Sequence, residues 1–233
     1  MSAYDAIADL YDPWSRTVTE DVAFYVAEAR KARSTVVELG VGTGRIAVPT
    51  AVAGVPVIGV DSSPGMLDVC RRVADKAAVS HLLDLRLGDF REPPVAEQVR
   101  LVTSPFRAFL HLETDAERRR ALAAVHGLLE PGGRFVFDVF APSDEDVEET
   151  HARWLEREPG IWERADWDLE RRKLTLRVRG PERETSLSLS WIPAEEWRVL
   201  LEAAGFEVVA CYGWFDLRPY AGGEDSIWLA RRP

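Results

Sequence analysis

The sequence predicts an α/β protein built on a doubly wound, mostly parallel sheet of seven strands. Three observations predict this class. Apolar stretches and helical stretches alternate five times with short connections, as expected for parallel strands covered on both faces. The first apolar stretch runs into a glycine-rich turn at 40–44. Acidic residues stand at the ends of the first three apolar stretches, at Glu38, Asp61 and Asp89.

Two helical patterns precede the first strand. Residues 4–11 carry aromatic and apolar side chains at helical spacing, and a second such stretch runs over about 19–31. In a doubly wound sheet, a leader of this kind must pack on an edge or fold over a ligand. We therefore expect helices at the amino end that can act as a lid.

The next strands and helices follow as apolar runs bounded by turn residues. We expect strands at 35–39, 56–60, 82–87, 99–103 and 134–140, and helices at 45–53, 63–73 and 114–129. Ser63 and Pro64 offer an N-cap with proline at the first helical position, and Thr114 with Glu117 forms a capping box. Residues 131–133 are expected to form a turn.

After Ala141 the pattern changes to period-two alternation, at 174–178 and 185–189, which predicts antiparallel strands with one solvated face. A helix opened by Pro193 and two strands, at 206–212 and 226–230, complete the chain. We expect three segments. Residues 1–141 hold the lid helices and the first five strands, 142–191 form a β-rich insertion, and 192–233 complete the sheet.

Composition and charge exclude some classes of binding partner and indicate where the protein acts. The 233 residues carry a formal net charge of −10, which argues against binding to nucleic acid or to an anionic membrane. Apolar runs such as 135–137 are too short to span a bilayer, and residues 1–5 do not resemble a signal peptide. Two cysteines without a CxxC motif, Cys70 and Cys211, are expected to be reduced core residues. These features predict a cytoplasmic protein.

Four motifs together resemble the class I S-adenosylmethionine-dependent methyltransferases. They are the stretches 38–44, 61–67, 88–90 and 131–133, within a resemblance that covers about 36–140. The glycine turn alone is weak evidence, because dinucleotide-binding domains use a similar device. The resemblance implies a Rossmann-like methyltransferase fold, in which a reversed terminal hairpin completes the sheet.

The resemblance also implies a site for S-adenosylmethionine at the carboxyl ends of the strands, with S-adenosylhomocysteine as product. The glycines would face the methionine moiety, Asp61 would accept the ribose hydroxyls, and Asp89 with Phe90 would close over the adenine. Met66 is equally well explained as a core residue, and Arg16 as a solvated one. The expected cofactor-binding residues are Tyr11, Arg16, Glu38, Gly40, Gly42, Gly44, Asp61, Ser62, Met66, Gly88, Asp89, Phe90, Thr103 and Ser104.

On the acceptor side, the expected catalytic residues are Tyr11 and His111. Tyr11 resembles the amino-terminal tyrosine of small-molecule N-methyltransferases, although it can also be a core aromatic. His111 follows the fourth strand, where it can act in acid/base chemistry or buttress the loop through a backbone carbonyl. The four histidines are scattered, and no metal is expected. The expected substrate-binding residues are Phe106, His111, Trp214, Phe215, Arg218 and Tyr220.

The predicted function is methyl transfer to a nitrogen or oxygen of a small molecule. The alternatives are a non-catalytic S-adenosylmethionine-binding protein on the same fold and a dinucleotide-binding oxidoreductase. The latter would prefer its third glycine one residue after Gly44. Methylation of nucleic acid or protein is disfavoured by the acidic balance and by residues 103–106, which lack an Asn/Asp-Pro-Pro-Tyr motif. The oligomeric state stays open, with a homodimer as one option.

Overall fold

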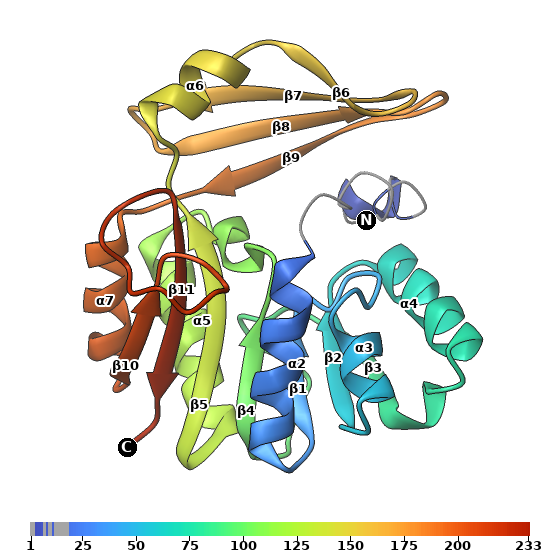
Figure 1. The fold of residues 1–233 in the computed structure, drawn as a ribbon, viewed down its shortest axis with the longest axis vertical. Helices are drawn as coiled ribbons and strands as arrows, with labels where there is room; N and C mark the ends of the chain where they lie inside the picture. Colours follow the sequence, from blue (N-terminus) through green and yellow to red (C-terminus); the bar gives the residue numbers. More distant parts are fainter. Residues whose placement is uncertain (1–2, 7, 9–10, 12–18) are drawn as a thin grey trace.

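The strands of the protein form two sheets that lie one above the other. The computed structural model describes residues 3–6, 8, 11 and 19–233. In this part of the chain, one sheet has seven strands and the other has four (Figure 1). The predicted fold class, a mostly parallel seven-stranded sheet with an added antiparallel one, is confirmed.

The seven-stranded sheet places its topological switch beside β1. Across the sheet the strands are β10 (Glu207–Tyr212), β11 (Asp225–Arg231), β5 (Leu129–Phe140), β4 (Val99–Ser104), β1 (Val36–Leu39), β2 (Val57–Asp61) and β3 (Leu83–Leu87). Among these described strands, only β11 runs against its neighbours, which gives the expected reversed hairpin. The chain moves outward from β1 to β3 and then returns to β4 on the other side of β1. Open α/β sheets bind ligands at such a switch, outside the carboxyl ends of the strands.

Helices cover both faces of this sheet (Figure 1). They are α2 (Glu20–Ala32), α3 (Ala47–Val52), α4 (Pro64–Lys76), α5 (Asp115–Leu128) and α7 (Ala194–Ala203), with short 3-10 turns η1 (Ala3–Ala6), η2 (Ser80–Leu82) and η3 (Ala108–His111). Side chains alternate between the two faces along each strand. Val36 joins the apolar cluster of α2, α3 and α4, whereas Val37 joins the cluster of α5 and α7. Both N-terminal caps predicted for α4 and α5 are present.

The four-stranded sheet lies over the carboxyl ends of the parallel strands (Figure 1). It consists of β6 (Trp154–Glu158), β7 (Ile161–Asp168), β8 (Lys173–Arg179) and β9 (Glu184–Ser190), all antiparallel, and is preceded by α6 (Asp144–Thr150). Strand β9 contacts both η1 and η3. The segment after the fifth strand therefore forms a roof over the edge where a ligand is expected. The proposed division of the chain into three segments, at residues 141 and 191, stays a prediction.

Several element boundaries differ from the prediction. Helix α3 starts at Ala47 rather than Arg45, because the turn continues through Ile46. Strand β5 starts at Leu129 rather than Arg134, and the expected turn at 131–133 lies inside it. Leu129 pairs with Val99 and Arg134 with Leu101, so the extra residues on β5 form an irregularity in the ladder. Helix α6 and strands β6 and β7 were not predicted.

Candidate active site

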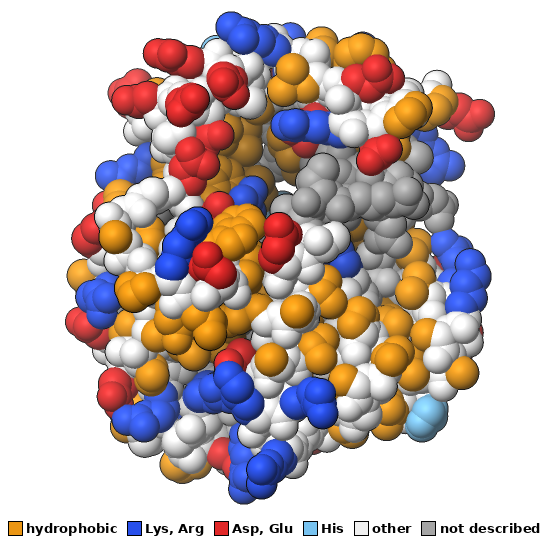
Figure 2. All heavy atoms as spheres, in the orientation of Figure 1, with side chains coloured by type: hydrophobic (Ala, Val, Ile, Leu, Met, Phe, Trp, Pro, Cys, Tyr) orange, Lys and Arg blue, Asp and Glu red, His pale blue; other side chains and the backbone are white. Residues whose placement is uncertain are grey.

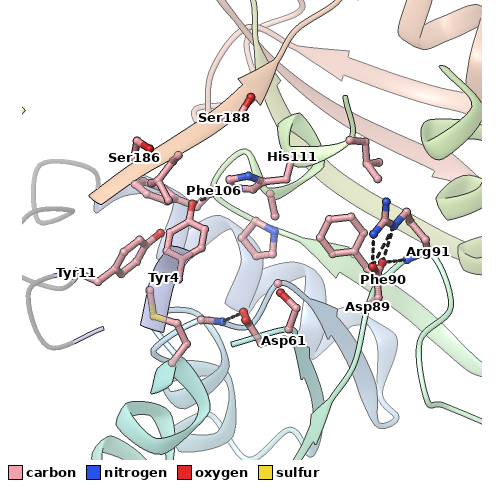
Figure 3. A pocket seen from close by; sticks show the side chains of 18 residues that line it. Tyr4, Tyr11, Asp61, Asp89, Phe90, Arg91, Phe106, His111, Ser186 and Ser188 are labelled. Atoms are coloured by element: carbon pink, nitrogen blue, oxygen red, sulfur yellow. Dashed lines mark hydrogen bonds and ion pairs between the residues drawn. The ribbon is translucent and has the colours of Figure 1, made fainter. Parts of the chain in front are cut away.

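A cavity of about 330 Å³ opens at the carboxyl ends of β1 to β4, and we call it the strand-end cavity (Figure 3). Its walls come from the loops after these four strands, from the amino-terminal segment and from β9. The volume lies at the lower end of the range for small-molecule sites. The lining residues are Tyr4, Tyr11, Gly40, Gly42, Asp61, Ser62, Met66, Asp89, Phe90, Arg91, Pro105, Phe106, Ala108, His111, Leu112, Ser186, Leu187 and Ser188.

The glycine turn has two different functions. Gly40, Gly42 and Gly44 all have positive φ, at 75°, 54° and 86°, which favours glycine. Gly40 and Gly42 line the strand-end cavity. At Gly44, which does not, a Cβ would lie 2.6 Å from Cys70 Sγ of α4. Gly40 and Gly42 present their backbone to the cavity, although a Cβ at Gly40 would also lie 2.8 Å from Ala108 Cβ. Gly44 lets the turn pack against α4.

Asp61 holds the glycine turn and the start of α4 together. Its Oδ2 accepts the Gly42 N–H at 2.8 Å and its Oδ1 accepts the Ser63 N–H at 2.8 Å (Figure 3). Burial raises the pKa of Asp61, while these backbone hydrogen bonds act in the opposite direction. The Ser62 backbone also bonds this carboxylate, so about one of its roughly four lone-pair sites stays open, and the residue lines the cavity. Asp61 can therefore accept a hydroxyl donor from a bound ligand.

Glu38 lies behind the turn and does not line the cavity. It is almost fully buried, and burial raises its pKa to about 8. The Ala47 backbone and the Arg45 guanidinium act to lower that pKa. Arg45 forms a bidentate pair with the buried Asp21 of α2, at 2.8 and 2.5 Å. Glu38 thus connects β1 to the first turn of α3, consistent with an anchor of the loop.

Asp89 and Phe90 follow β3 and line the cavity beside Arg91 (Figure 3). The Arg91 guanidinium donates to both Asp89 oxygens, with a contact of 2.5 Å from Nη2, and lowers the pKa of that carboxyl. Phe90 stacks on the buried Phe109, with 5.6 Å between ring centres. Gly88 packs against Pro94 and is not a lining residue. The Asp89 carboxylate is thus already paired with Arg91, and the sequence did not predict this partner.

A second cavity of about 330 Å³ lies between the two sheets, and we call it the inter-sheet cavity. Its roof comes from the four-stranded sheet and is mostly apolar, with Arg157 and Glu163 as its charged residues. Two further acidic residues, Asp146 and Glu224, also line the cavity. Figure 2 shows the surface hollowed between the two lobes. The residues that line only this cavity and not the first are Arg107, Phe140, Asp146, Thr150, Arg157, Glu163, Ala165, Trp167, Leu174, Leu176, Leu189 and Glu224.

Five residues line both cavities, and four of them form an aromatic partition. These four are Tyr4, Tyr11, Phe106 and His111, and the fifth is Leu187. Tyr4 meets Tyr11 edge-on at 5.8 Å between ring centres, and Tyr11 meets Phe106 at 6.3 Å. The structure therefore brings the two expected catalytic residues, Tyr11 and His111, to the boundary between the two cavities.

His111 is bonded on both sides of its ring. Its Nε2 lies 2.7 Å from the Tyr4 hydroxyl, and it also bonds the Ser188 backbone. Burial lowers its pKa to about 4, so the ring is neutral at pH 7. The bond to the Ser188 backbone raises this pKa, as a ring N–H that donates to a carbonyl does. Nε2 then accepts from the Tyr4 hydroxyl. This matches the buttressing interpretation of His111, with Tyr4 as an additional partner.

Other expected residues lie elsewhere. Thr103 and Ser104 are buried, and their hydroxyls bond the backbone oxygens of Val37 and Leu39 rather than facing either cavity. Arg16 lies outside the described residues. The two cavities are not lined by the four aromatic and basic residues expected at 214–220, which are Trp214, Phe215, Arg218 and Tyr220. Their role in binding an acceptor stays a prediction.

The loop at 214–220 makes other contacts. Phe215 lies 5.6 Å from Phe24 and 6.1 Å from Tyr25, measured between ring centres, so it covers α2. Trp214 and Arg218 line a third pocket with residues 141–143, 219 and 221–225, and this pocket shares Glu224 with the inter-sheet cavity. The sequence placed this loop at the correct edge of the sheet but did not show to which side it folds.

Sequence reasoning missed several residues that shape the site. Tyr4 stands seven residues before Tyr11, a spacing that brings two residues to one helix face and that could have indicated it. Asp5 fixes this segment, because its Oδ1 accepts the Ser63 hydroxyl at 2.6 Å and the Gly65 N–H at 3.2 Å. Asp138, in the apolar strand β5, was also missed. An acidic residue within an otherwise apolar strand is the feature of the sequence that could have indicated it.

The described residues include neither a metal-binding cluster nor a membrane-spanning helix. No group of three or more histidine, cysteine or acidic side chains there is placed to hold a metal ion. No helix in that part of the chain is long and apolar enough to span a membrane.

The chain is similar to known methyltransferases in both sequence and fold. Residues 36–133 match the methyltransferase domain family. An uncharacterized methyltransferase of Geobacillus kaustophilus is 32% identical over 189 residues, which cover 72% of this chain and 81% of that protein. The cypemycin N-terminal methyltransferase of a Streptomyces species is 25% identical over 228 residues, 94% of this chain and 90% of that protein. The CcbJ methyltransferase from Streptomyces caelestis has a TM-score of 0.87 and 28% identity, with 100% of this chain and 98% of that chain covered.

Proposed function

Because the chain belongs to the class I S-adenosylmethionine-dependent methyltransferases, we propose that it methylates a nitrogen or oxygen of a small molecule. The inter-sheet cavity carries the proposal on the acceptor. Its volume of about 330 Å³ suits a small molecule, and it adjoins the strand-end cavity across the aromatic partition. A net charge of −10 also disfavours nucleic acid as the acceptor.

The residues of the strand-end cavity fit S-adenosylmethionine. Gly40 and Gly42 leave the backbone open to close approach, and Asp61 offers a carboxylate oxygen to a ribose hydroxyl. Phe90 and Met66 supply apolar surface for a flat base, although Met66 also packs on Ala8 and Val69. The cavity thus combines a carboxylate, open backbone and apolar walls in the order that this nucleotide-like ligand requires.

Alignment and exclusion of water account for most of the expected catalysis. When bound, S-adenosylmethionine supplies a methyl group on a sulfonium, which an acceptor lone pair displaces in line. Tyr4, Tyr11 and Phe106 separate the two cavities and restrict the path by which an acceptor approaches. The apolar roof, including Leu174 and Leu187, keeps water away from that path.

His111 acts in this proposal through Tyr4 rather than as a strong base. A ring whose pKa is about 4 accepts a proton poorly at pH 7, because the protonated form is disfavoured by burial. His111 Nε2 instead fixes the orientation of the Tyr4 hydroxyl at the partition. Tyr4 in turn meets Tyr11 edge-on, so His111 helps to hold the aromatic side chains that separate the two cavities.

The test is a turnover screen combined with a blocked cavity. The wild-type protein and S-adenosylmethionine are incubated with amines, alcohols and a peptide with a free amino terminus, and S-adenosylhomocysteine is measured. In the variant Leu176→Trp, we expect the acceptor KM to rise about tenfold or more, since small changes in an apolar pocket have effects of that size. The control Arg177→Trp lies next to it on β8 and does not line the cavity.

The two variants separate the possible outcomes. A selective defect in Leu176→Trp supports acceptor binding between the sheets. An unchanged acceptor KM in Leu176→Trp, with the same S-adenosylhomocysteine affinity in both variants, would remove the inter-sheet cavity from the proposal.

A further inference from the structure

The loop after β4 adopts an unusual backbone conformation at the partition. Phe106 and Arg107 are consecutive and both have left-handed φ, at 55° and 63°. The other non-glycine residues with positive φ in the described part of the chain are isolated ones. Side chains with a Cβ disfavour this region, so the surrounding structure must hold both residues in place.

The group that holds them is the carboxylate of Asp138 on β5. Its Oδ1 accepts the Phe106 N–H at 2.8 Å, and its Oδ2 accepts the Arg107 N–H at 3.0 Å. The Tyr25 hydroxyl of α2 donates to the same Oδ1 at 2.6 Å. Asp138 and Tyr25 are both buried, at 6% and 1% exposure. Both oxygens of a buried carboxylate are thus used to fix two strained residues.

This conformation directs the two side chains to different places. Phe106 enters the partition, where it lines both cavities, meets Tyr11 and lies 4.4 Å below the Arg45 guanidinium. Arg107 lines only the inter-sheet cavity, where it lies over Phe140 and donates to Asp225 at 2.8 Å. The position of the Phe106 ring therefore depends on the backbone that Asp138 fixes.

A purely structural loop would not need this arrangement. Glycine adopts left-handed φ without strain, as it does at three positions of the turn after β1. A buried carboxylate is unfavourable unless its bonds compensate, and burial here raises the pKa of Asp138 to about 6. The chain nevertheless combines an aromatic and a basic side chain at 106–107 with a buried acid.

We propose that Asp138 is a positioning residue for methyl transfer, because its carboxylate holds Phe106 between the strand-end cavity and the inter-sheet cavity. The inference rests on the proposed function, in which cofactor and acceptor occupy these two cavities. Asp138 touches neither of them and acts through the backbone of Phe106 and Arg107.

The experiment compares three variants with the wild type. Asp138→Asn replaces one acceptor oxygen by a donor, so one of the two backbone bonds is lost. Tyr25→Phe is the matched control, because it removes one bond to Asp138 but keeps both backbone bonds. The double variant Asp138→Asn/Arg107→Gly places glycine at one strained position. For each, calorimetry measures S-adenosylhomocysteine affinity and urea denaturation measures stability.

We expect Asp138→Asn to bind S-adenosylhomocysteine about tenfold more weakly, the effect of one lost hydrogen bond to a charged group. Tyr25→Phe should bind with a smaller loss. The double variant should recover affinity, since glycine keeps the left-handed backbone without the carboxylate. Once an acceptor is identified, kcat should follow the same order. If Asp138 only stabilised the fold, S-adenosylhomocysteine affinity and kcat would stay at the wild-type level in every variant that is folded, and only the free energy of unfolding would change.

Two results would overturn the inference. One is an Asp138→Asn protein that is less stable but binds and turns over as the wild type does. The other is a double variant whose S-adenosylhomocysteine affinity is no better than that of Asp138→Asn. If Asp138→Asn does not fold, a folded double variant that binds S-adenosylhomocysteine much more weakly than the wild type would overturn the inference in the same way. A wild-type protein that fails to bind S-adenosylhomocysteine at all would instead contradict the proposed function.

Discussion

Replacing Gly44 by alanine tests whether the glycine turn is shaped by its packing against α4. Gly44 has φ of 86°, which is strained for alanine by roughly 1–2 kcal/mol. The added Cβ would also lie 2.6 Å from Cys70 Sγ and 3.0 Å from Val48 Cγ2. Overpacking of this kind adds roughly 1–3 kcal/mol. The expected loss in the free energy of unfolding is therefore about 2–5 kcal/mol.

Gly54→Ala is the matched control. Gly54 has φ of 83°, nearly the same as Gly44, but a Cβ there would have nothing within 4 Å. It should lose only the backbone contribution, roughly 1–2 kcal/mol. In the double variant Gly44→Ala/Cys70→Ala, the nearest remaining atom of residue 70 is a Cβ at 3.6 Å, an ordinary contact. When compared with Cys70→Ala alone, that variant should therefore regain part of the free energy of unfolding that the steric overlap removes.

Urea denaturation at constant pH gives the free energies of unfolding from the midpoint and slope. S-adenosylhomocysteine affinity is measured on the same samples. Since Met66 of α4 lines the strand-end cavity, displacement of α4 should weaken binding in Gly44→Ala but not in Gly54→Ala. Equal losses of stability in Gly44→Ala and Gly54→Ala would refute the packing argument.

Three further results are expected. The pKa of Glu38 is raised to about 8 in the folded protein, so its stabilising contribution is full below about pH 4.5 and is lost as pH rises through 8. The free energy of unfolding should fall more over this range in the wild type than in Glu38→Gln, as measured by urea denaturation. Trp214→Ala should leave S-adenosylhomocysteine affinity and acceptor KM within about twofold, since Trp214 lines neither cavity and isolated surface changes are small. Tyr4→Phe removes the hydroxyl that bonds His111 and should lower kcat by up to about tenfold, the effect of one lost hydrogen bond, with little change in S-adenosylhomocysteine affinity. A larger effect of Trp214→Ala than of Tyr4→Phe on turnover would reverse the assignment of the acceptor site.

The sequence predicted the features that depend on local spacing. The capping residues Ser63 and Thr114 bond backbone groups three residues further along the chain, and the glycines at 40, 42 and 44 form a turn with positive φ, as expected. Asp61 ends β2, where the apolar pattern indicated it. The sheet with its reversed hairpin follows from the order of strands and helices. These predictions succeed because short-range chemistry and the period of apolar residues determine them.

Contacts between distant segments were not predictable in the same way. Tyr4 reaches His111 across 107 positions in the chain, and Asp138 reaches Tyr25 across 113. The single sequence shows neither pairing, since both depend on where the leader and β5 fold against the loop after β4. The same limitation applies to Trp214, which lines neither the strand-end cavity nor the inter-sheet cavity but a pocket that shares Glu224 with the latter.

Asp89 shows how a correct position can be incompletely described. The spacing placed it correctly at the end of β3, and it lines the strand-end cavity. Arg91, two residues later, pairs with both of its oxygens, and Arg91 in turn forms an ion pair with Glu117 of α5. Charge pairs of this kind depend on which direction a loop turns, which apolar periodicity does not indicate.

The most direct test of the account is calorimetric titration with S-adenosylmethionine, S-adenosylhomocysteine and NADH. We predict that the wild type binds both sulfur ligands and not NADH. Asp61→Ala should weaken their binding about tenfold or more, because it removes a carboxylate that faces the cavity. Asp68→Ala, an exposed carboxylate on α4, should bind as the wild type does. Binding of NADH alone, or unchanged affinity in Asp61→Ala, would contradict the placement of the cofactor at the ends of β1 to β4.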